Sequence, residues 1–529
     1  MTIQEQAASM SHDEIVTLLL DQQKISETNT TLTTHVEELQ RQLDWFKRQL
    51  FGTKSDRRIL LENTRQLTLG ESLHPHDDSV SVPATTVREH SRRKRTSSSI
   101  GEDKLRFDPS VPIEVIEIPN TEVRGNEDDY YLVGEKVTDR LAQRPGSYVV
   151  LRHVRKVYKE KKSGTFSCPP APASVLDKSF ADVSFLAGLL IEKYRYHLPY
   201  YRQHQRLAAA GITIGRSTLT NLAQRVADLL DPICAAQLNS ILSSKVLAMD
   251  ETPIRAGRGS KGKMKMGYFW PIYGDRDEMV FPFSPSRSGN LVDEVLAGYR
   301  GVLLTDGYKV YERYAEKVNE IVHAQCWSHT RRKFTEAEAV EPELSGHILD
   351  RIASLYKFEK EIRDRKLADK RKQVYRAEHC KPVIDEIFSR LEESMQEHIL
   401  LPSSPFTKAA NYALDREDAL RVFLEYPNVP VDTNHLEREI RPIALGRKNW
   451  LFCWTELGAH DTGVIQSLLT TCRLQGVDPY VYLVDVLQRM STHPARDVAQ
   501  LTPRLWKEHF AHNPMRSDLD RIRSRDPGG

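Results

Sequence analysis

The chain contains 529 residues, a length that predicts roughly three or four domains. Its 75 lysines and arginines nearly balance its 73 acidic residues, which excludes a protein held to nucleic acid by bulk charge alone. The longest apolar run, residues 185–191, is far shorter than the roughly 20 residues that a membrane span needs. Six cysteines scattered without a pairing rhythm are typical of a reducing compartment, so we expect a cytoplasmic protein without a membrane partner.

The N-terminal segment, residues 1–54, carries a heptad pattern. Apolar side chains recur at strict seven-residue intervals across residues 15–50, with Gln22 and Asn29 as polar members of the seam. A period of exactly seven residues favours a coiled coil over a single amphipathic helix lying on a globular domain. We therefore expect this segment to join copies of the chain, with a parallel dimer as the first choice.

Two segments of different character follow the heptads. Residues 55–105 are polar and include a basic run at 90–99, which is typical of a solvated linker, with phosphate contact as the alternative. Residues 106–175 contain short apolar or alternating runs before a proline-rich break, and this pattern predicts a β-rich module.

Residues 176–240 have helical patterning and contain a candidate DNA-binding motif. Residues 201–210, a glycine-bounded turn at 211–215 and residues 216–230 predict a helix, a turn and a second helix. A helix-turn-helix for DNA and an ordinary helical hairpin are both compatible with this spacing. In the first case the polar face of the second helix would contact DNA through Arg216, Thr220, Asn221 and Arg225.

After residue 240 the predicted elements follow the order β-β-β-α-β-α-β-α. Asp250 lies midway in the first predicted strand, residues 246–254, and Asp306 ends the fourth. This order and these two acids are typical of a ribonuclease-H-like core. Either aspartate alone could be a turn or cap residue, but acids on two adjacent strands indicate paired carboxylates whose repulsion cations would relieve. Two Mg²⁺ or Mn²⁺ ions at such a pair support phosphoryl transfer.

A later helix offers the third carboxylate that such a site needs. Glu437 shares one helix face with Asn434, Arg438 and Arg441, although helix geometry alone makes Glu439 nearly as good a candidate. A surface ion pair between residues 437 and 441 is the alternative role for that face, and it would contribute little stability.

Further candidate residues are basic, aromatic or able to bind metal. Two segments are suited to contacting DNA: a basic helix after the fifth strand, and residues 445–452. For residues 445–452, the alternative is a buried aromatic side chain with solvated basic neighbours. The pair Cys326 and His329 is only half of a zinc site, so we expect it to be structural and near the active site. The basic and aromatic candidates are Arg331, Arg332, Lys333, Arg447, Lys448 and Trp450.

Several strings in this chain resemble the large transposase of the bacterial insertion-sequence-66 family. The resemblance covers nearly the whole chain, and the string at 434–452, which begins Asn-His-Leu-Glu-Arg-Glu, is highly specific. The other strings lie at residues 50–56, 193–202, 249–252, 306–308 and 326–334.

The resemblance implies a DDE transposase with Asp250, Asp306 and Glu437 as its catalytic, metal-binding acids. The family pattern Asn-x-x-Glu-Arg is what selects Glu437 over Glu439. The implied fold class is a multidomain α/β protein whose ribonuclease-H-like core is interrupted by a helical insertion. The implied boundaries are a core at 241–334 and 431–455, an insertion at 335–430 and a small helical C-terminal domain at 456–529.

One segment departs from the family pattern. Family members usually carry a zinc-ribbon-like module with two cysteine pairs, but the matching stretch here contains Cys168 alone. Structural zinc needs four ligands, so we expect 106–175 to be a degenerate module that folds without zinc.

We therefore expect a transposase that binds the ends of an insertion sequence, cuts them and joins the 3′ ends to target DNA. Its partners would be double-stranded DNA at the terminal inverted repeats and the target, further copies of itself, and accessory proteins of the same element, in association with the bacterial nucleoid. One alternative is an inactive or domesticated DNA-binding protein, which the three acids argue against. The other is a metal-dependent nuclease on the same fold, which explains the heptads and the long end-binding region less well.

Overall fold

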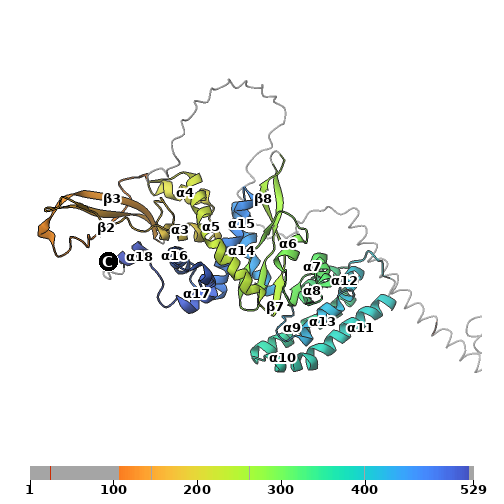
Figure 1. The fold of residues 1–529 in the computed structure, drawn as a ribbon. Coiled ribbons are helices and arrows are strands. Elements are labelled where there is room, and N and C mark those ends of the chain that lie inside the picture. Colours follow the sequence, from red (N-terminus) through yellow and green to blue (C-terminus); the bar gives the residue numbers. More distant parts are fainter. Residues whose placement is uncertain (1–23, 25–105, 145, 261–262, 398–399, 524–529) are drawn as a thin grey trace, which may run out of the picture. The chain divides into compact units, whose positions relative to one another are not determined.

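The computed structural model describes residue 24 and residues 106–144, 146–260, 263–397 and 400–523. Apart from Lys24, the heptad segment and the linker lie outside these residues, so the coiled coil stays a prediction. The described chain is a mixed α/β structure with many helices (Figure 1). No helix within these ranges combines the length and the apolar character that crossing a membrane requires.

Residues 106–175 are built on one long β-hairpin. β4 is the central strand, with β2 parallel on one side and β3 antiparallel on the other. Leu141, Val150 and Leu151 are buried near the turn that joins β3 to β4, whereas Tyr131 and Val137, farther from the turn, are more than half exposed. The module is therefore anchored at one end by apolar packing. Its strands are β1 (Arg106–Phe107), β2 (Ile113–Ile118), β3 (Tyr130–Arg144), β4 (Ser147–Glu160) and β5 (Phe166–Ser167).

The next region is helical and shares its core with the C-terminal helices. α5 extends well past the predicted end near residue 230, because its apolar stripe continues through Ile233 and Ile241 beyond the internal Pro232. Buried side chains of α3 and α5 form one hydrophobic cluster with those of α15 and α16. The elements are α3 (Val183–Tyr194), α4 (Tyr200–Ala209), β6 (Ile212–Thr213), α5 (Arg216–Leu242), α15 (Glu456–Leu474), α16 (Pro479–Arg489), α17 (Pro503–His509) and α18 (Asp518–Arg523).

A five-stranded sheet of order β11-β10-β7-β13-β14 forms the centre of the next part. β7, β13 and β14 are parallel, and β10 and β11 join antiparallel at one edge. Every residue of β7 is buried, as expected for a central strand that is covered on both faces. The strands are β7 (Val246–Met249), β10 (Ile272–Gly274), β11 (Glu278–Val280), β13 (Gly301–Thr305) and β14 (Ile321–Gln325).

A second, three-stranded sheet and three helices complete this part of the chain. The sheet has the order β12-β9-β8. Its strands are β8 (Thr252–Arg258), β9 (Met264–Phe269) and β12 (Phe283–Ser284), and the helices are α6 (Asn290–Val295), α7 (Lys309–Lys317) and α8 (Trp327–Ala337).

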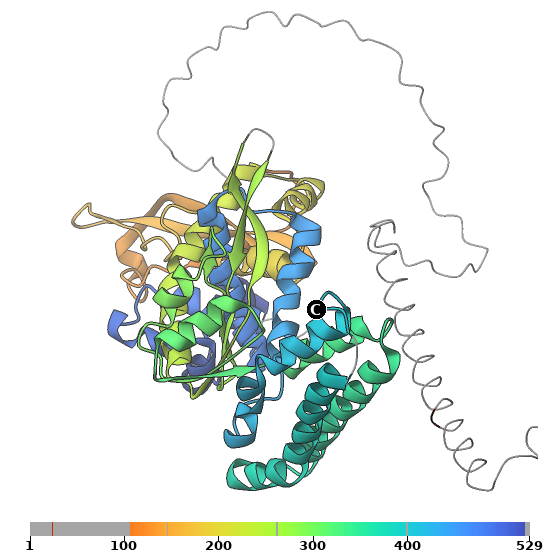
Figure 2. The ribbon, with the colours of Figure 1, turned by 90° about the vertical axis from the view of Figure 1, so that its right-hand side faces the viewer.

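Residues 338–433 are mainly helical and separate α8 from α14, which carries the third candidate acid (Figure 2). Arg376 is completely buried among these helices and donates two hydrogen bonds to Glu359. Its helices are α9 (Pro342–Asp364), α10 (Asp369–Tyr375), a π-helical turn (Arg376–Cys380), α11 (Lys381–Glu397), α12 (Pro405–Leu414) and α13 (Glu417–Glu425), followed by α14 (Asn434–Trp450).

Candidate active site

Asp250 and Asp306 follow two neighbouring parallel strands at the same edge of the central sheet. β7 and β13 pair with Ala248 opposite Leu304, and each aspartate lies two residues beyond its member of that pair. The register therefore brings the two acids to matching positions. Asp250 lies after the end of β7 rather than midway in a strand as predicted, because the chain leaves the central sheet there and β8 joins the second sheet.

The environment of Asp250 disfavours its charged form. Burial raises the pKa of the Asp250 carboxyl to about 7, and the negative charge of Asp306 acts in the same direction. The charges of Glu251 and Glu437 raise it further, while a hydrogen bond from the Glu251 backbone N–H to Asp250 Oδ1, 2.7 Å long, lowers it. The three expected acids therefore act on one another electrostatically, as acids around a cation site do.

α14 directs Glu437 and Glu439 to opposite environments. Glu437 is half-buried, and its buried Oε1 accepts no hydrogen bond from the described residues. Glu439 is buried on the other face of the helix, where Arg473 of α15 donates a hydrogen bond to its carboxylate. Glu437 therefore lies close enough to Asp250 for its charge to raise the pKa of that carboxyl, whereas Glu439 is paired with Arg473.

Cys326 and His329 connect α8 to α14. The backbone N–H and the hydroxyl of Thr433, which precedes α14, both lie 3.3 Å from Cys326 Sγ. One turn along α8, His329 Nε2 lies 3.7 Å from Glu437 Oε1. Burial lowers the pKa of His329, while the charges of Asp306 and Glu437 oppose that effect. The pair therefore adjoins the acids and fixes the start of α14.

Glu251 is a site residue that the sequence analysis did not single out. Its side chain is 4% exposed and forms an ion pair with Arg287, and the Tyr311 hydroxyl donates a hydrogen bond of 3.0 Å to it. Burial raises its pKa, and the bond from Arg287 works against this. The adjacent Asp-Glu pair at 250–251 was the available signal, but a second acid next to a candidate ligand has no periodic pattern that marks it as buried.

The comparisons with known proteins assign the family. Residues 178–461 match the model described as "Transposase IS66 family". The chain belongs to the IS66 transposase family. Residues 467–504 match the model "IS66 C-terminal element", and residues 38–103 match the model "Transposase C of IS166 homeodomain".

Relatives from Sinorhizobium fredii (strain NBRC 101917 / NGR234) span most of this IS66-family chain. "Uncharacterized protein y4hP" is 28% identical over 504 residues, which cover 90% of each chain. "Uncharacterized protein y4jD" is 29% identical over 500 residues, covering 90% of this chain and 96% of the relative.

The expected DNA contacts of this IS66-family protein fall into separate groups. Arg438 and Arg441 follow Glu437 on α14 and are exposed, as are Arg331, Arg332 and Lys333 on α8. These residues lie on the same two helices as His329 and Glu437.

The other predicted contacts lie at the end of α14 and on α5. Lys448 is exposed, whereas Arg447 is half-buried and donates a hydrogen bond to the Pro253 carbonyl. Trp450 is half-buried and packs back onto Gly446, where an added Cβ would lie only 2.5 Å from the indole ring. The candidates at the start of α5 are Arg216, Thr220 and Asn221, which are exposed, and Arg225, which is half-buried and donates to the Asp177 carbonyl.

The acids suit a divalent cation by their chemistry, although the described side chains do not already form a ligand cluster. In the ranges that the structure covers, no three Asp, Glu, His or Cys side chains are arranged as ligands of one ion. The buried Oε1 of Glu437, which accepts no hydrogen bond from the described residues, and the raised pKa of Asp250 are nevertheless two features that a bound cation would relieve. Carboxylate oxygens are the ligands that Mg²⁺ and Mn²⁺ prefer.

Proposed function

We propose that this IS66-family protein is a DDE transposase with Asp250, Asp306 and Glu437 as its catalytic acids. The observation that carries the proposal is the electrostatic effect on Asp250 of two other acids, Asp306 at the neighbouring strand end and Glu437 on α14. Three further features support a ribonuclease-H-like core at 241–334 and 431–455. They are the parallel pair of strands, the later acid on a helix, and the helical segment between them.

The three acids would hold two Mg²⁺ or Mn²⁺ ions, which when bound neutralise charge at the attacking and leaving oxygens of a phosphodiester. The protein's own groups orient these ligands. The backbone N–H of Tyr308 donates a hydrogen bond of 2.9 Å to Asp306 Oδ1, and the N–H of Glu251 does the same for Asp250. His329 lies against Glu437. Each acid therefore has a neighbouring group that restrains its orientation.

In the proposed reaction, hydrolysis of a phosphodiester at the element's end frees a 3′-hydroxyl. That hydroxyl then attacks a phosphodiester of the target, forming a new P–O bond as the target's own 3′ oxygen leaves. Exposed arginines next to the acids, Arg438 and Arg441, would contact the DNA backbone, because phosphates contribute most of the binding free energy of such complexes.

The remaining segments would recognise and pair the element's ends. Further DNA contacts would come from the start of α5, the basic residues of α8 and the end of α14. The homeodomain-like match at 38–103 supports a DNA-binding role for the N-terminal part. Residues 1–54 would join two copies through the heptads, and 106–175 would fold without zinc. The protein would act at the bacterial nucleoid together with any accessory proteins of its element.

The test uses full-length protein, DNA that carries the inverted repeats flanking its gene, and Mg²⁺. Asp250→Asn, Asp306→Asn and Glu437→Gln should each abolish cleavage and strand joining while leaving binding to the ends largely intact. Glu336→Gln, which removes an exposed acid on α8, is the matched control. Cleavage without joining would indicate the nuclease alternative, and end binding without any cleavage by the unaltered protein would indicate a domesticated DNA-binding protein.

A further inference from the structure

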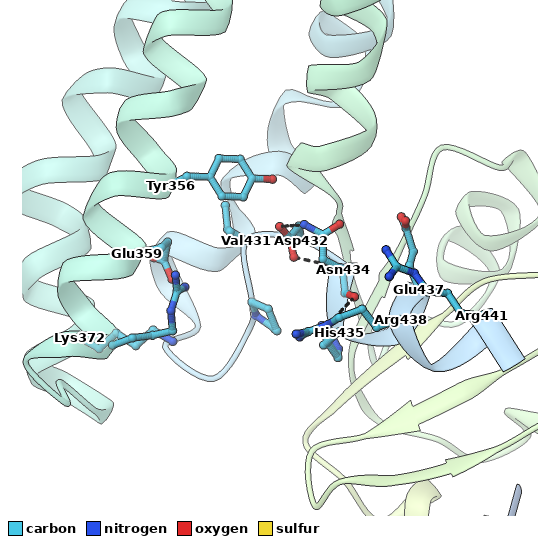
Figure 3. A pocket seen from close by; sticks show the side chains of 12 residues that line it. Tyr356, Glu359, Lys372, Val431, Asp432, Asn434, His435, Glu437, Arg438 and Arg441 are labelled. Atoms are coloured by element: carbon cyan, nitrogen blue, oxygen red, sulfur yellow. Dashed lines mark hydrogen bonds between the residues drawn. The ribbon is translucent and has the colours of Figure 1, made fainter. Parts of the chain in front are cut away.

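A cleft separates the helical insertion from the helix that carries Glu437. It has a volume of about 950 Å³, and Figure 3 shows side chains of α9 and α10 facing those of α14 and the segment before it. Because Glu437 itself lines the cleft, the space continues directly from the candidate active site.

Cations dominate the chemistry of this cleft. Arg363 and Lys372 reach it from the insertion, and Arg438 and Arg441 from α14. Among the described residues, none of these four side chains forms an ion pair within 4.0 Å. Four cations from α9, α10 and α14 around one space raise the local positive potential and favour the binding of an anion there.

Two of the three acids that line the cleft, Glu359 and Asp432, already accept hydrogen bonds from other residues. Both carboxylate oxygens of Glu359 accept hydrogen bonds from buried Arg376, at 2.7 and 2.9 Å. The charge of Glu359 is thus largely balanced by Arg376, although it still raises the pKa of Lys372 to a small extent. Burial lowers the pKa of Lys372 to about 8, and the positive charge of Arg376 contributes in the same direction. Asp432 accepts hydrogen bonds from the backbone and the side chain of Asn434.

The size of the cleft indicates which form of DNA it could hold. Its volume lies at the upper end of the range for ligand pockets, about 300–1,000 Å³. A DNA duplex does not fit inside a space of this volume, since its major groove alone is about 12 Å wide. A few unpaired nucleotides need only a basic groove that follows their backbone.

We propose that this cleft binds the phosphates of an unpaired DNA strand next to the cleavage point, with Arg363 and Lys372 as the insertion's contacts. This inference rests on the proposed function and extends it, because it gives the helical insertion a role in holding the strand. The insertion residues would act on binding, whereas the three acids act on the reaction.

The experiment compares two DNA probes on full-length protein without metal, so that no catalysis is needed. One probe is a blunt duplex of an element end, and the other is the same duplex with a short unpaired thymidine extension past the cleavage point. The test variant is Arg363→Gln with Lys372→Gln. The matched control is Lys360→Gln with Lys370→Gln, exposed lysines of α9 and α10 that do not line the cleft.

The test variant should bind the extended probe on the order of tenfold more weakly and bind the blunt probe as before. The slope of log affinity against log salt should flatten by about 1.4, since each contact to a single strand contributes about 0.7. The control should match the unaltered protein on both probes, and Lys372→Arg alone should keep its affinity, because the charge remains.

Equal losses on both probes would overturn the inference in favour of a duplex contact, and no loss on either would overturn it outright. If the unaltered protein cuts and joins DNA but the variant binds the extended probe normally, only this inference fails. If the unaltered protein binds neither probe, the proposed function fails with it.

Discussion

His329 Nε2 and Glu437 Oε1 lie 3.7 Å apart, and this contact joins α8 to the acid that α14 contributes. One turn earlier on each helix, Cys326 and Thr433 are in hydrogen-bonding contact. The Cys-x-x-His pair and the N-terminal turn of α14 therefore meet at two successive levels. The pair thus holds the start of α14 against α8, a structural role for which no zinc ion is needed.

We expect His329→Gln to slow DNA cleavage about 10- to 100-fold, the cost typical of losing a group that orients a metal ligand. End binding should stay nearly unchanged, because the imidazole faces Glu437 rather than the exposed arginines. The measurement is single-turnover cleavage over a range of Mg²⁺ concentrations, where a positioning role predicts that more Mg²⁺ is needed. His347→Gln, which removes a half-exposed histidine paired with Glu386, serves as the control. Equal effects of both substitutions would argue against a positioning role.

Cys326→Ala should destabilise the protein, because two donors of Thr433 would lose a buried acceptor. Each unsatisfied buried group costs about 1–3 kcal/mol. Cys380→Ala, at a fully buried cysteine of the insertion, measures the cost of the lost volume alone. Urea unfolding should show the larger loss for Cys326→Ala, and a zinc chelator should leave the unaltered protein's stability unchanged. Unfolding triggered by the chelator would instead place zinc at this pair or elsewhere in the chain.

The buried pair of Arg376 and Glu359 provides a stability test of the insertion. Arg376→Met should cost about 3–5 kcal/mol, because it leaves the Glu359 carboxylate buried without a partner. Adding Glu359→Leu should recover much of that loss. Recovery should stay incomplete, since Arg376 also donates to the Phe423 carbonyl at 2.6 Å. Denaturant unfolding of the two single variants and the double variant checks this, and a double variant less stable than Arg376→Met would contradict it.

The sequence singled out the two aspartates because an acid that interrupts or ends a short apolar strand is a local pattern. It could not separate Glu437 from Glu439 by helix geometry, since the difference lies in Arg473, a partner 34 residues along the chain on α15. The family pattern supplied that choice. The position of Asp250 within its strand was mispredicted because pairing partners, and not local propensity, decide that β8 leaves the central sheet.

The cleft itself was not predictable from sequence. Arg363 and Lys372 lie in a stretch rich in lysine, arginine and glutamate, a composition that by itself predicts a solvated helix surface. Only the pairing of Glu359 with Arg376 and the approach of α14 distinguish these two cations from their neighbours. Both features depend on tertiary contacts between segments far apart in the chain.

The stability of the central sheet should fall in mild acid because of His323 on β14. Burial lowers the pKa of this imidazole to about 4, and Thr305 Oγ1 lies 2.9 Å from its Nε2. In the unfolded chain the pKa is about 6.5, so between these two values the unfolded state binds the proton more readily. The contribution of His323 to the free energy of unfolding is therefore fully present above about pH 6.5 and decreases as the pH falls towards 4, by up to about 3 kcal/mol.

His323→Gln keeps a polar group near Thr305 but does not titrate. Urea unfolding at about pH 7 and about pH 5 should show a smaller difference for this variant than for the unaltered protein. An identical difference in the two proteins would mean that other groups cause the acid sensitivity.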